Sequence, residues 1–316
     1  MTGGLRLLFF GTPEFAVPSL AALVDAGVVP LLVVSQPDRP AGRGKRLAAP
    51  PVARWARERG LPVAQPQRVG TPAFLAELRE LAPDVAAVVA FGQIFPRELL
   101  VLPRLGCVNV HASLLPRWRG AAPIQAAIAA GDAETGVTTM LMEEGLDSGP
   151  MLLRRATPIG EAETAGELAG RLAAMGADLL VETLAALDAG RLAPLPQPAE
   201  GITRAPKVAP GVQRLDWNLP AAELARRILA ASPSPGVEAE LGGRPARLLR
   251  ARPLAARREP AAAPGSLLGL EGEALAVAAG EGSLLGLLEL QRPGRRVLPA
   301  REFANGERLR PGDRLR

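Results

Sequence analysis

The chain has 316 residues, 48% of them hydrophobic, and a formal net charge of +5, and a chain of this length usually forms two domains. Its longest nearly apolar run, residues 85–95, is too short to cross a bilayer, and its first residues do not resemble a signal peptide, so we expect a cytoplasmic protein. One His and one Cys leave no plausible zinc site, so no metal is expected.

Apolar, strand-like stretches alternate with helical patterns over the first 189 residues. Strands are expected at 5–10, 30–35, 63–65, 84–90, 106–111, 136–142 and 151–159, and helices at 13–26, 51–60, 71–81, 122–130 and 164–188. Thr12 is the expected N-cap of the first helix, and Thr164 with Glu167 forms a capping box for the last one. This alternation predicts an α/β fold with a Rossmann-like, mostly parallel sheet flanked by helices.

A Pro-rich stretch, residues 190–211, is predicted to link a first domain, residues 1–189, to a second one, residues 212–316. A helix at 221–231 and short strands set off by Gly turns predict a small β-barrel there. Residues 204–316 carry 19 Lys and Arg against 12 Asp and Glu, a net charge of +7, whereas residues 1–203 carry 18 against 20, a net charge of −2. The basic second domain fits a nucleic-acid partner or an Arg-rich solvated surface equally well.

The single His of the chain, His111, lies in a polar run at the expected end of a strand, two residues after Asn109. Imidazole can donate a hydrogen bond or a proton near neutral pH. Asp147 follows another expected strand, in a Gly-rich loop. Because open α/β sheets place ligands at the carboxyl ends of their strands, we expect the three side chains to share one crevice. The alternatives are a buried structural His and an Asp that only forms an Asx turn.

A loop at 36–47 carries several cations on a backbone that two Gly make adaptable and two Pro restrict. The cations considered for binding are Arg39, Arg43, Lys45 and Arg46. Such a loop can follow a row of phosphates, which predicts a contact to RNA, although an ordinary solvated loop has the same composition. No Walker sequence follows it, and no Gly-x-Gly-x-x-Gly follows a strand, which disfavours a dinucleotide-dependent oxidoreductase.

Six segments give the chain a resemblance to a known family. They are residues 11–15 (GTPEF), 36–47 (QPDRPAGRGKRL), 109–120 (NVHASLLPRWRG), 121–125 (AAPIQ), 131–136 (GDAETG) and 145–150 (GLDSGP). Together they resemble the methionyl-tRNA formyltransferases of the folate-dependent formyltransferase superfamily. The Asn, His, SLLP and Asp pattern belongs to the superfamily as a whole, whereas the basic loop and RWRGAAPIQ narrow the resemblance to the tRNA enzymes.

The resemblance implies transfer of the formyl group of 10-formyltetrahydrofolate to the α-amino group of initiator methionyl-tRNA, for translation initiation. Asn109 and His111 would donate hydrogen bonds to the formyl oxygen as negative charge develops on it. Asp147 would orient the imidazole and favour its protonated form, or order a water that carries the proton. Folate would be held by Ser113, Leu114, Leu115 and Pro116 and by the backbone at Val88, Val89, Ala90, Phe91 and Gly92.

The family further implies that the basic loop contacts the tRNA acceptor stem and that the second domain is OB-like and binds tRNA. A monomer is expected. The sequence departs from the family at 231–236 (ASPSPG), where an aromatic-rich stretch is usual, and at Phe91, where Tyr is frequent. The first departure puts a local RNA contact in doubt, and the second should matter little if main-chain groups recognise the pterin.

Three hypotheses compete at this point. The first is the tRNA formyltransferase. The second is a folate-dependent enzyme with another acceptor, such as a nucleotide-sugar or purine intermediate, or a hydrolase that releases formate. The third is a non-catalytic RNA-binding protein. Intact Asn109, His111 and Asp147 favour an enzyme. Only the basic loop and the basic second domain favour tRNA as the acceptor.

Overall fold

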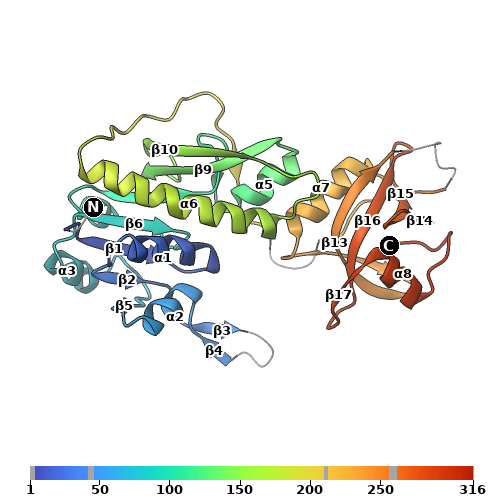
Figure 1. Cartoon of the computed structure of the whole chain (residues 1–316), viewed down its shortest axis with the longest axis horizontal. Helices are drawn as coiled ribbons and strands as arrows, with labels where there is room; N and C mark the ends of the chain where they lie inside the picture. The colour runs from blue at the N-terminus through green and yellow to red at the C-terminus, as the bar shows by residue number, and fades with distance from the viewer. Residues whose placement is uncertain (1–3, 42–45, 210–212, 256–261, 316) are drawn as a thin grey trace. The chain divides into compact units, whose positions relative to one another are not determined.

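The computed structural model describes residues 4–41, 46–209, 213–255 and 262–315 (Figure 1). The chain divides into two compact units, which are described separately below. The first holds Met1–Gly120, Thr135–Thr157 and Ala169–Arg204, and the second holds Ala121–Glu134, Pro158–Leu168 and Ala205–Arg316. The domain boundaries expected from the sequence, with a linker at 190–211, stay a prediction.

A seven-stranded sheet forms the centre of the first unit. In spatial order its strands are β10 (Met151–Pro158), β9 (Glu134–Leu141), β7 (Cys107–His111), β6 (Val85–Val89), β1 (Leu7–Gly11), β2 (Leu32–Val34) and β5 (Val63–Ala64). The five strands from β7 to β5 are parallel, whereas β9 is antiparallel to β7. The prediction of a mostly parallel α/β sheet is therefore confirmed.

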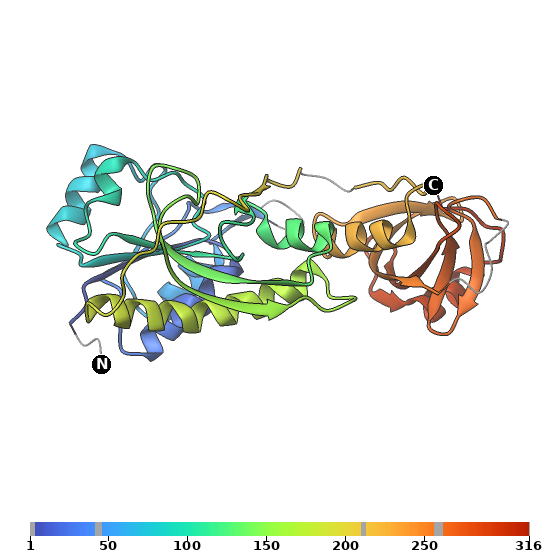
Figure 2. The same ribbon diagram turned by 90° about the horizontal axis from the view of Figure 1, so that it is seen from above.

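Helices cover both faces of this sheet (Figure 2). One face packs against α1 (Val17–Asp25) and α6 (Ala165–Asp188), and the other against α3 (Pro72–Glu80) and α4 (Arg97–Leu100). The core of the second face joins strand and helix residues. It includes Leu8, Phe10, Val34, Ala86, Val88, Phe74, Leu78 and Leu99. Because both faces are covered, the central strands are apolar on both sides, as their sequences indicate.

The predicted N-cap at Thr12 is wrong. The first helix begins with a 3-10 turn, η1 (Glu14–Ala16), and α1 follows only at Val17. Thr12 Oγ1 instead donates to the carbonyl oxygen of Phe91 at 2.9 Å and accepts the backbone N–H of Gln36 at 3.4 Å. Because these residues follow β1, β6 and β2, the hydroxyl joins the carboxyl ends of three neighbouring strands.

Short elements complete the first unit. They are α2 (Pro51–Glu58), the paired strands β3 (Arg39–Ala41) and β4 (Arg46–Ala48), and β8 (Arg119–Gly120), which pairs with β11 (Arg204–Ala205) where the first unit ends. Among the described helices of the chain, none is long and apolar enough to cross a membrane.

The second unit is built on an antiparallel sheet of six strands. Their order is β12 (Val237–Leu241), β13 (Arg244–Leu254), β16 (Leu284–Gln291), β15 (Ala274–Ala278) and β14 (Leu267–Glu271), with β17 (Val297–Pro299) paired to β16. Backbone bridges join Leu241 to Leu315 and Ser266 to Arg314. Both edges of the sheet thus meet the same terminal segment, so the sheet curves towards closure.

Among the described residues, three helices lie wholly in the second unit. They are α5 (Pro123–Ala130), α7 (Ala221–Ala231) and α8 (Ala300–Glu307). Leu224 and Ile228 of α7 and Phe303 of α8 fill the core inside the curved sheet. A separate antiparallel β domain after the α/β domain is confirmed, whereas its OB-like topology stays a prediction.

Candidate active site

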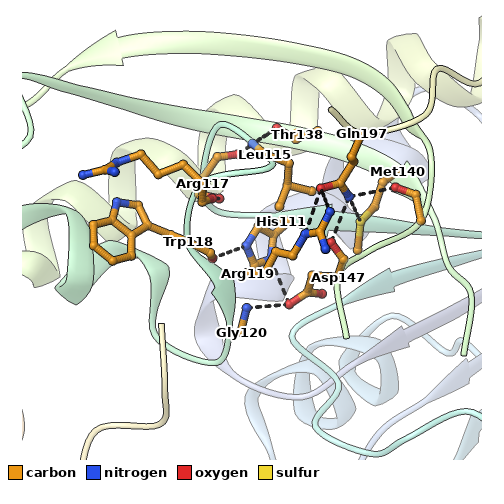
Figure 3. Close-up of polar contacts among 12 residues, drawn as sticks. His111, Leu115, Arg117, Trp118, Arg119, Gly120, Thr138, Met140, Asp147 and Gln197 are labelled. Carbon is orange, nitrogen blue, oxygen red and sulfur yellow. Dashed lines mark hydrogen bonds and ion pairs between the residues drawn. The ribbon is translucent and has the colours of Figure 1, made fainter. Parts of the chain in front are cut away.

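Strand β7 places Asn109 and His111 on the same face of the sheet, because side chains alternate along a strand. Val110 between them faces α6, where a Cβ built on Gly176 would lie 2.9 Å from Val110 Cγ1. The antiparallel pairing sets Met140 of β9 beside Asn109 and Thr138 beside His111. These four side chains therefore lie on the face that α6 does not cover. Loops carry the remaining groups of the site, among them Asp147 and Gln197 (Figure 3).

His111 is buried, with 5% of its surface exposed, and its two ring nitrogens face two oxygens (Figure 3). Nε2 lies 2.9 Å from the carbonyl oxygen of Trp118, and Nδ1 lies 3.7 Å from Oδ2 of Asp147. A carbonyl oxygen only accepts hydrogen bonds, so Nε2 carries a hydrogen and donates it to Trp118. The imidazole is therefore held by the protein at one nitrogen and directed to a carboxylate at the other.

Asp147 has an unusual backbone conformation. Its φ of 51° lies in the left-handed region, which costs a residue other than Gly on the order of 1 kcal/mol. Oδ2 of Asp147 accepts the backbone N–H of Gly120 at 2.8 Å. Two residues further on, a Cβ at Gly149 would come within 1.8 Å of the carbonyl oxygen of Leu141, so only Gly fits there. These contacts fix both the backbone and the carboxylate of the Asp147 turn.

Asp147 approaches His111 by a different route from the predicted one. Because β9 is antiparallel to β7, its last residue, Leu141, pairs with Val108, whereas Thr138 pairs with His111. Strand β9 therefore does not end at the edge where β7 ends, and the expectation that both polar groups leave the same edge is wrong. The loop after β9 must turn back along the sheet to bring Asp147 beside His111.

Asn109 has a half-buried side chain next to this pair. Its amide makes no hydrogen bond to any residue in the described ranges. An amide carries two donor hydrogens and an acceptor oxygen, so Asn109 can bind a ligand without breaking a bond inside the protein.

The SLLP segment forms a stiff turn after β7. Ser113 Oγ donates to the carbonyl oxygen of Arg117 at 2.6 Å. Thr138 Oγ1 donates to the carbonyl oxygen of Ser113 at 2.7 Å and accepts the N–H of Leu115 at 3.1 Å. Ser113 and Leu115 are fully buried, so their side chains support the turn from inside, while Leu114 and Pro116 are partly exposed.

The segment from Val88 to Gly92 ends β6, the strand next to β7. Val88 and Val89 are buried, whereas Ala90 and Gly92 are exposed and have φ values of 46° and 83°. The ring of Phe91 packs edge-on against two other Phe rings, with centroid distances of 5.4 and 5.9 Å. Its carbonyl oxygen already accepts bonds from Thr12 and Gln36, so the groups left for a ligand lie at Ala90 and Gly92.

A cavity of about 820 Å³ opens where β2 and β6 end. Its lining includes Gln36, Asp38, Arg39, Arg68, Thr71, Gly92, Gln93 and Ile94. Strand β1 lies between β2 and β6, so the chain changes direction across the sheet here, which is where open α/β sheets bind their ligands. The volume lies within the usual range for small-molecule sites, and Arg39 and Arg68 contribute positive charge.

The basic segment at 36–47 is not a loop throughout, as the sequence predicts, because it contains two paired strands, and the β3–β4 hairpin is named for them. Strands β3 and β4 pair antiparallel, with Arg39 opposite Ala48 and Ala41 opposite Arg46. Arg39 is exposed and lines the cavity. Arg43 and Lys45 lie outside the described residues, and of Arg46 only the backbone is described.

Residues 195–203 of the predicted linker lie against the site. Leu195 exchanges backbone hydrogen bonds of 2.7 and 2.8 Å with Met151. Thr203 accepts the N–H of Trp118 through its hydroxyl at 2.8 Å and the N–H of Arg119 through its carbonyl oxygen at 3.0 Å. Gln197, between these points, bonds to Arg119 and to the Asp147 turn. Sequence reasoning missed these contacts, because the only signal was an amide among prolines.

Two further observations concern the cysteine and possible metal ligands. Burial raises the pKa of the Cys107 thiol to about 12, so this cysteine is a packed core residue and not a nucleophile. Within the described part of the chain, no group of three or more His, Cys, Asp or Glu could hold a metal ion.

Comparison with known proteins shows similarity to formyltransferases over most of the chain. The family model described as formyl transferase matches residues 5–184, and the one described as formyl transferase, C-terminal domain, matches residues 207–308. The methionyl-tRNA formyltransferase of Halorhodospira halophila is 53% identical to this chain, over 98% of each sequence. That of Myxococcus xanthus is 50% identical, over 97% of this chain and 96% of its own length.

A solved structure adds a likeness in fold. The N-formyltransferase from Helicobacter canadensis, in complex with folinic acid and dTDP-3-aminofucose, has a TM-score of 0.66 to this chain and is 15% identical to it. The match covers 90% of this chain and 98% of the other. At that level of identity the likeness concerns the fold and not the acceptor.

Proposed function

This chain belongs to the methionyl-tRNA formyltransferases, and we propose how its residues carry out the reaction of that family. The enzyme transfers the formyl group of 10-formyltetrahydrofolate to the α-amino group of methionyl-tRNA. The amine nitrogen attacks the formyl carbon, negative charge develops on the formyl oxygen, and the bond from carbon to N10 then breaks. The amine must lose one proton and N10 must gain one.

Asn109 is the direct donor to the formyl oxygen. The observation that carries this proposal is its half-buried amide, which has no partner in the described ranges and lies beside the His111–Asp147 pair. A donor that is already in place when charge develops stabilises the transition state without reorganisation. His111 differs from Asn109, because its Nε2 hydrogen is donated to the carbonyl oxygen of Trp118. The imidazole can donate to the formyl oxygen only if the bound substrate replaces Trp118 as the acceptor.

Asp147 and His111 assist the transfer of the proton from the attacking amine to N10. The carboxylate faces Nδ1 at 3.7 Å while Gly120 holds its Oδ2, so the pair is fixed in orientation at the reacting carbon. The α-amino group of an aminoacyl ester needs little base catalysis to become neutral near physiological pH, since its ordinary pKa is about 7.7 to 8.0. What the pair contributes is a positioned path from the attacking nitrogen to N10.

Folate lies along the carboxyl ends of β6 and β7. The exposed backbone at Ala90 and Gly92 faces the pterin, the SLLP turn supports it from below, and the cavity beside Gly92 takes the remainder of the molecule. The basic hairpin, with Arg39, Arg43, Lys45 and Arg46, and the basic second unit contact tRNA phosphates. We assign the initiator methionyl-tRNA as the acceptor. The active enzyme is a monomer, and it acts in the cytoplasm.

A direct assay tests this function against the other folate-dependent activities. The protein is incubated with 10-formyltetrahydrofolate and either initiator methionyl-tRNA, elongator methionyl-tRNA, a dTDP-amino sugar, or no acceptor. The expected product is formylmethionyl-tRNA, formed faster from the initiator than from the elongator. A formylated amino sugar, or free formate without a formylated tRNA, would overturn the proposal.

A further inference from the structure

The side-chain amide of Gln197 uses every hydrogen-bonding position that it has (Figure 3). Its Oε1 accepts from Arg119 Nε at 3.0 Å and Nη2 at 2.8 Å. Its Nε2 donates to the carbonyl oxygens of Asp147 and Gly149, both at 2.8 Å, with Met140 Sδ further away at 3.9 Å. An amide has two donor hydrogens and two acceptor lone pairs, so the side chain is saturated.

The orientation of this amide follows from its partners. Guanidinium groups only donate and carbonyl oxygens only accept, so oxygen must face Arg119 and nitrogen must face the Asp147 turn. Gln197 is half-buried, although residues 193–196 and 198–201 around it are exposed. The segment is therefore fixed to the first unit at this side chain, between the backbone contacts of Leu195 and Thr203.

Arg119 lies between the two residues that hold the His111–Asp147 pair. The carbonyl oxygen of Trp118 accepts from His111 Nε2, and the N–H of Gly120 donates to Asp147 Oδ2. By bonding to Arg119 on one side and to the backbone of Asp147 on the other, Gln197 connects the segment that holds the imidazole with the turn that carries the carboxylate.

We propose that Gln197 is a positioning residue for formyl transfer, which sets the placement of Asp147 relative to His111. The inference rests on the proposed roles of these two residues. The left-handed conformation of Asp147 needs outside support, and Gln197 bonds to the carbonyl oxygen of that same residue. Loss of the amide lets the turn relax, and a displacement of about 1 Å at a catalytic group can cost on the order of 10²-fold in rate.

The first test replaces the amide by a side chain of similar length. Gln197→Met should lower kcat by roughly 10- to 100-fold, while KM for methionyl-tRNA and for 10-formyltetrahydrofolate stays within about twofold, because no substrate contact is removed. Gln197→Glu keeps an acceptor for Arg119 but sets a carboxylate against two carbonyl oxygens, so its kcat should fall at least as far. Should Gln197→Met fail to fold, Arg119→Met, which removes the opposite partner, takes its place.

Two matched controls separate positioning from folding. Leu195→Ala changes an exposed side chain in the same segment, and Gln291→Met makes the same substitution in the second unit, where Gln291 donates to the carbonyl oxygen of Arg295. Both should keep wild-type kcat. A lower melting temperature for Gln197→Met with an unchanged kcat per folded molecule would show a purely structural role and overturn the inference.

A double-mutant comparison decides whether Gln197 acts through Asp147. If it does, Gln197→Met should have little further effect in an Asp147→Asn background, so the combined loss should be far below the product of the single losses. Full multiplication of the two losses would overturn the inference. The wild-type enzyme and the single variant Asp147→Asn are measured in the same assay. If the wild type forms no formylmethionyl-tRNA, the proposed function is refuted. If Gln197→Met has a normal kcat while Asp147→Asn is impaired, only the role of Gln197 is refuted.

Discussion

Asn109 and His111 share a strand and a face but have different partners. Asn109 has none in the described part of the chain, whereas both nitrogens of His111 face oxygens. We expect Asn109→Ala and His111→Ala each to lower kcat by roughly 10²- to 10³-fold, the usual loss for one oxyanion donor. Steady-state formylation with both substrates saturating measures this, and circular dichroism checks that the variants fold.

A suitable control for these two variants is Asn305→Ala. Asn305 is an exposed residue of α8 in the second unit, so its removal should leave kcat unchanged. Near-normal turnover of Asn109→Ala would remove this residue from the oxyanion site, and near-normal turnover of His111→Ala would make the imidazole a buried structural group.

Asp147→Asn isolates the charge of the carboxylate. Asn can still accept the N–H of Gly120, so the turn should survive, but the negative charge that faces His111 Nδ1 is removed. We expect a kcat loss close to that of His111→Ala and, because the two side chains act as a unit, a double variant far less impaired than the product of both losses. If the kcat loss of the double variant equals the product of the two single losses, Asp147 and His111 act independently and Asp147 does not belong to the pair.

At the residue scale the sequence predicts that Asn109, His111 and Asp147 lie close together, but not how they are arranged. The isolated His111 and the polar groups around it point to one site, and the structure does bring Asp147 to 3.7 Å from the ring. The predicted reason, two strands ending at one edge, is wrong, because residue spacing does not tell whether β9 runs parallel or antiparallel to β7. Nor does the sequence show that Nε2 of His111 is held by the carbonyl oxygen of Trp118, since every residue type has a carbonyl oxygen.

Among the secondary-structure elements, the β3–β4 hairpin is the candidate tRNA-binding element. We expect the double variant Arg43→Ala, Lys45→Ala to raise KM for methionyl-tRNA and to flatten its salt dependence. The log–log slope should fall by about 0.7 to 0.9 for each phosphate that the variant no longer neutralises. KM for 10-formyltetrahydrofolate should not change. Formylation rates across a range of salt concentrations provide the measurement.

The pair Arg54→Ala, Arg79→Ala is the charge-matched control for the hairpin. Both residues are exposed, on α2 and α3, and removing them also takes away two positive charges. If the hairpin variant and this control shift the salt slope equally, general charge rather than the hairpin sets tRNA affinity.

The start of α6 gives a prediction about pH. Thr164 and Glu167 form the predicted capping box, and Arg250 donates a further hydrogen bond to Glu167, which lowers the pKa of that carboxyl group to about 2. Because folding lowers this pKa from its ordinary value of 4.5, the ionised carboxylate stabilises the folded protein fully at a pH above 4.5. This contribution is lost as the pH falls towards 2 and the carboxylate becomes protonated in the folded protein as well. The difference in melting temperature between wild type and Glu167→Gln should therefore be largest above about pH 5 and shrink below it.

Glu240→Gln serves as the control for that measurement. Glu240 is an exposed carboxylate on β12, and its replacement should shift the melting temperature little at any pH. A difference between wild type and Glu167→Gln that stays constant from about pH 6 to about pH 3 would mean that the carboxylate charge of Glu167 does not stabilise the fold.

Helices and strands with strong local signals are predicted well, and segments held by tertiary contacts are not. The capping box at Thr164 uses residues three positions apart, so the sequence alone reveals it. Thr12 has an equally good local position, but its hydroxyl bonds to Phe91, 79 residues away. Similarly, Gln197 belongs to a Pro-rich stretch whose composition indicates a linker, yet its partners are 48, 50 and 78 residues away.

For the molecule as a whole, charge is distributed unevenly. Residues 1–203 have a net charge of −2, from 18 Lys and Arg against 20 Asp and Glu, and residues 204–316 have +7, from 19 against 12. Binding a folate and one methionyl group does not require this surplus of positive charge, whereas a polyanion such as tRNA is attracted by it. The second unit offers few aromatic side chains for stacking on bases, since only Trp217 and Phe303 follow residue 204 and both are buried, so its contribution should be electrostatic.

The positive surplus of the second unit can be tested at two of its arginines. Arg295 and Arg296 are exposed between β16 and β17, and their joint replacement by Ala should raise KM for methionyl-tRNA and lower its salt slope by about 0.7 to 0.9 for each phosphate that they neutralise. At saturating tRNA, kcat should stay at the wild-type value, because the reacting groups belong to the first unit. Arg154→Ala with Arg191→Ala, two exposed cations of the first unit, is the matched control. If the Arg295, Arg296 variant keeps the wild-type slope, these two cations do not bind tRNA and form part of a solvated surface.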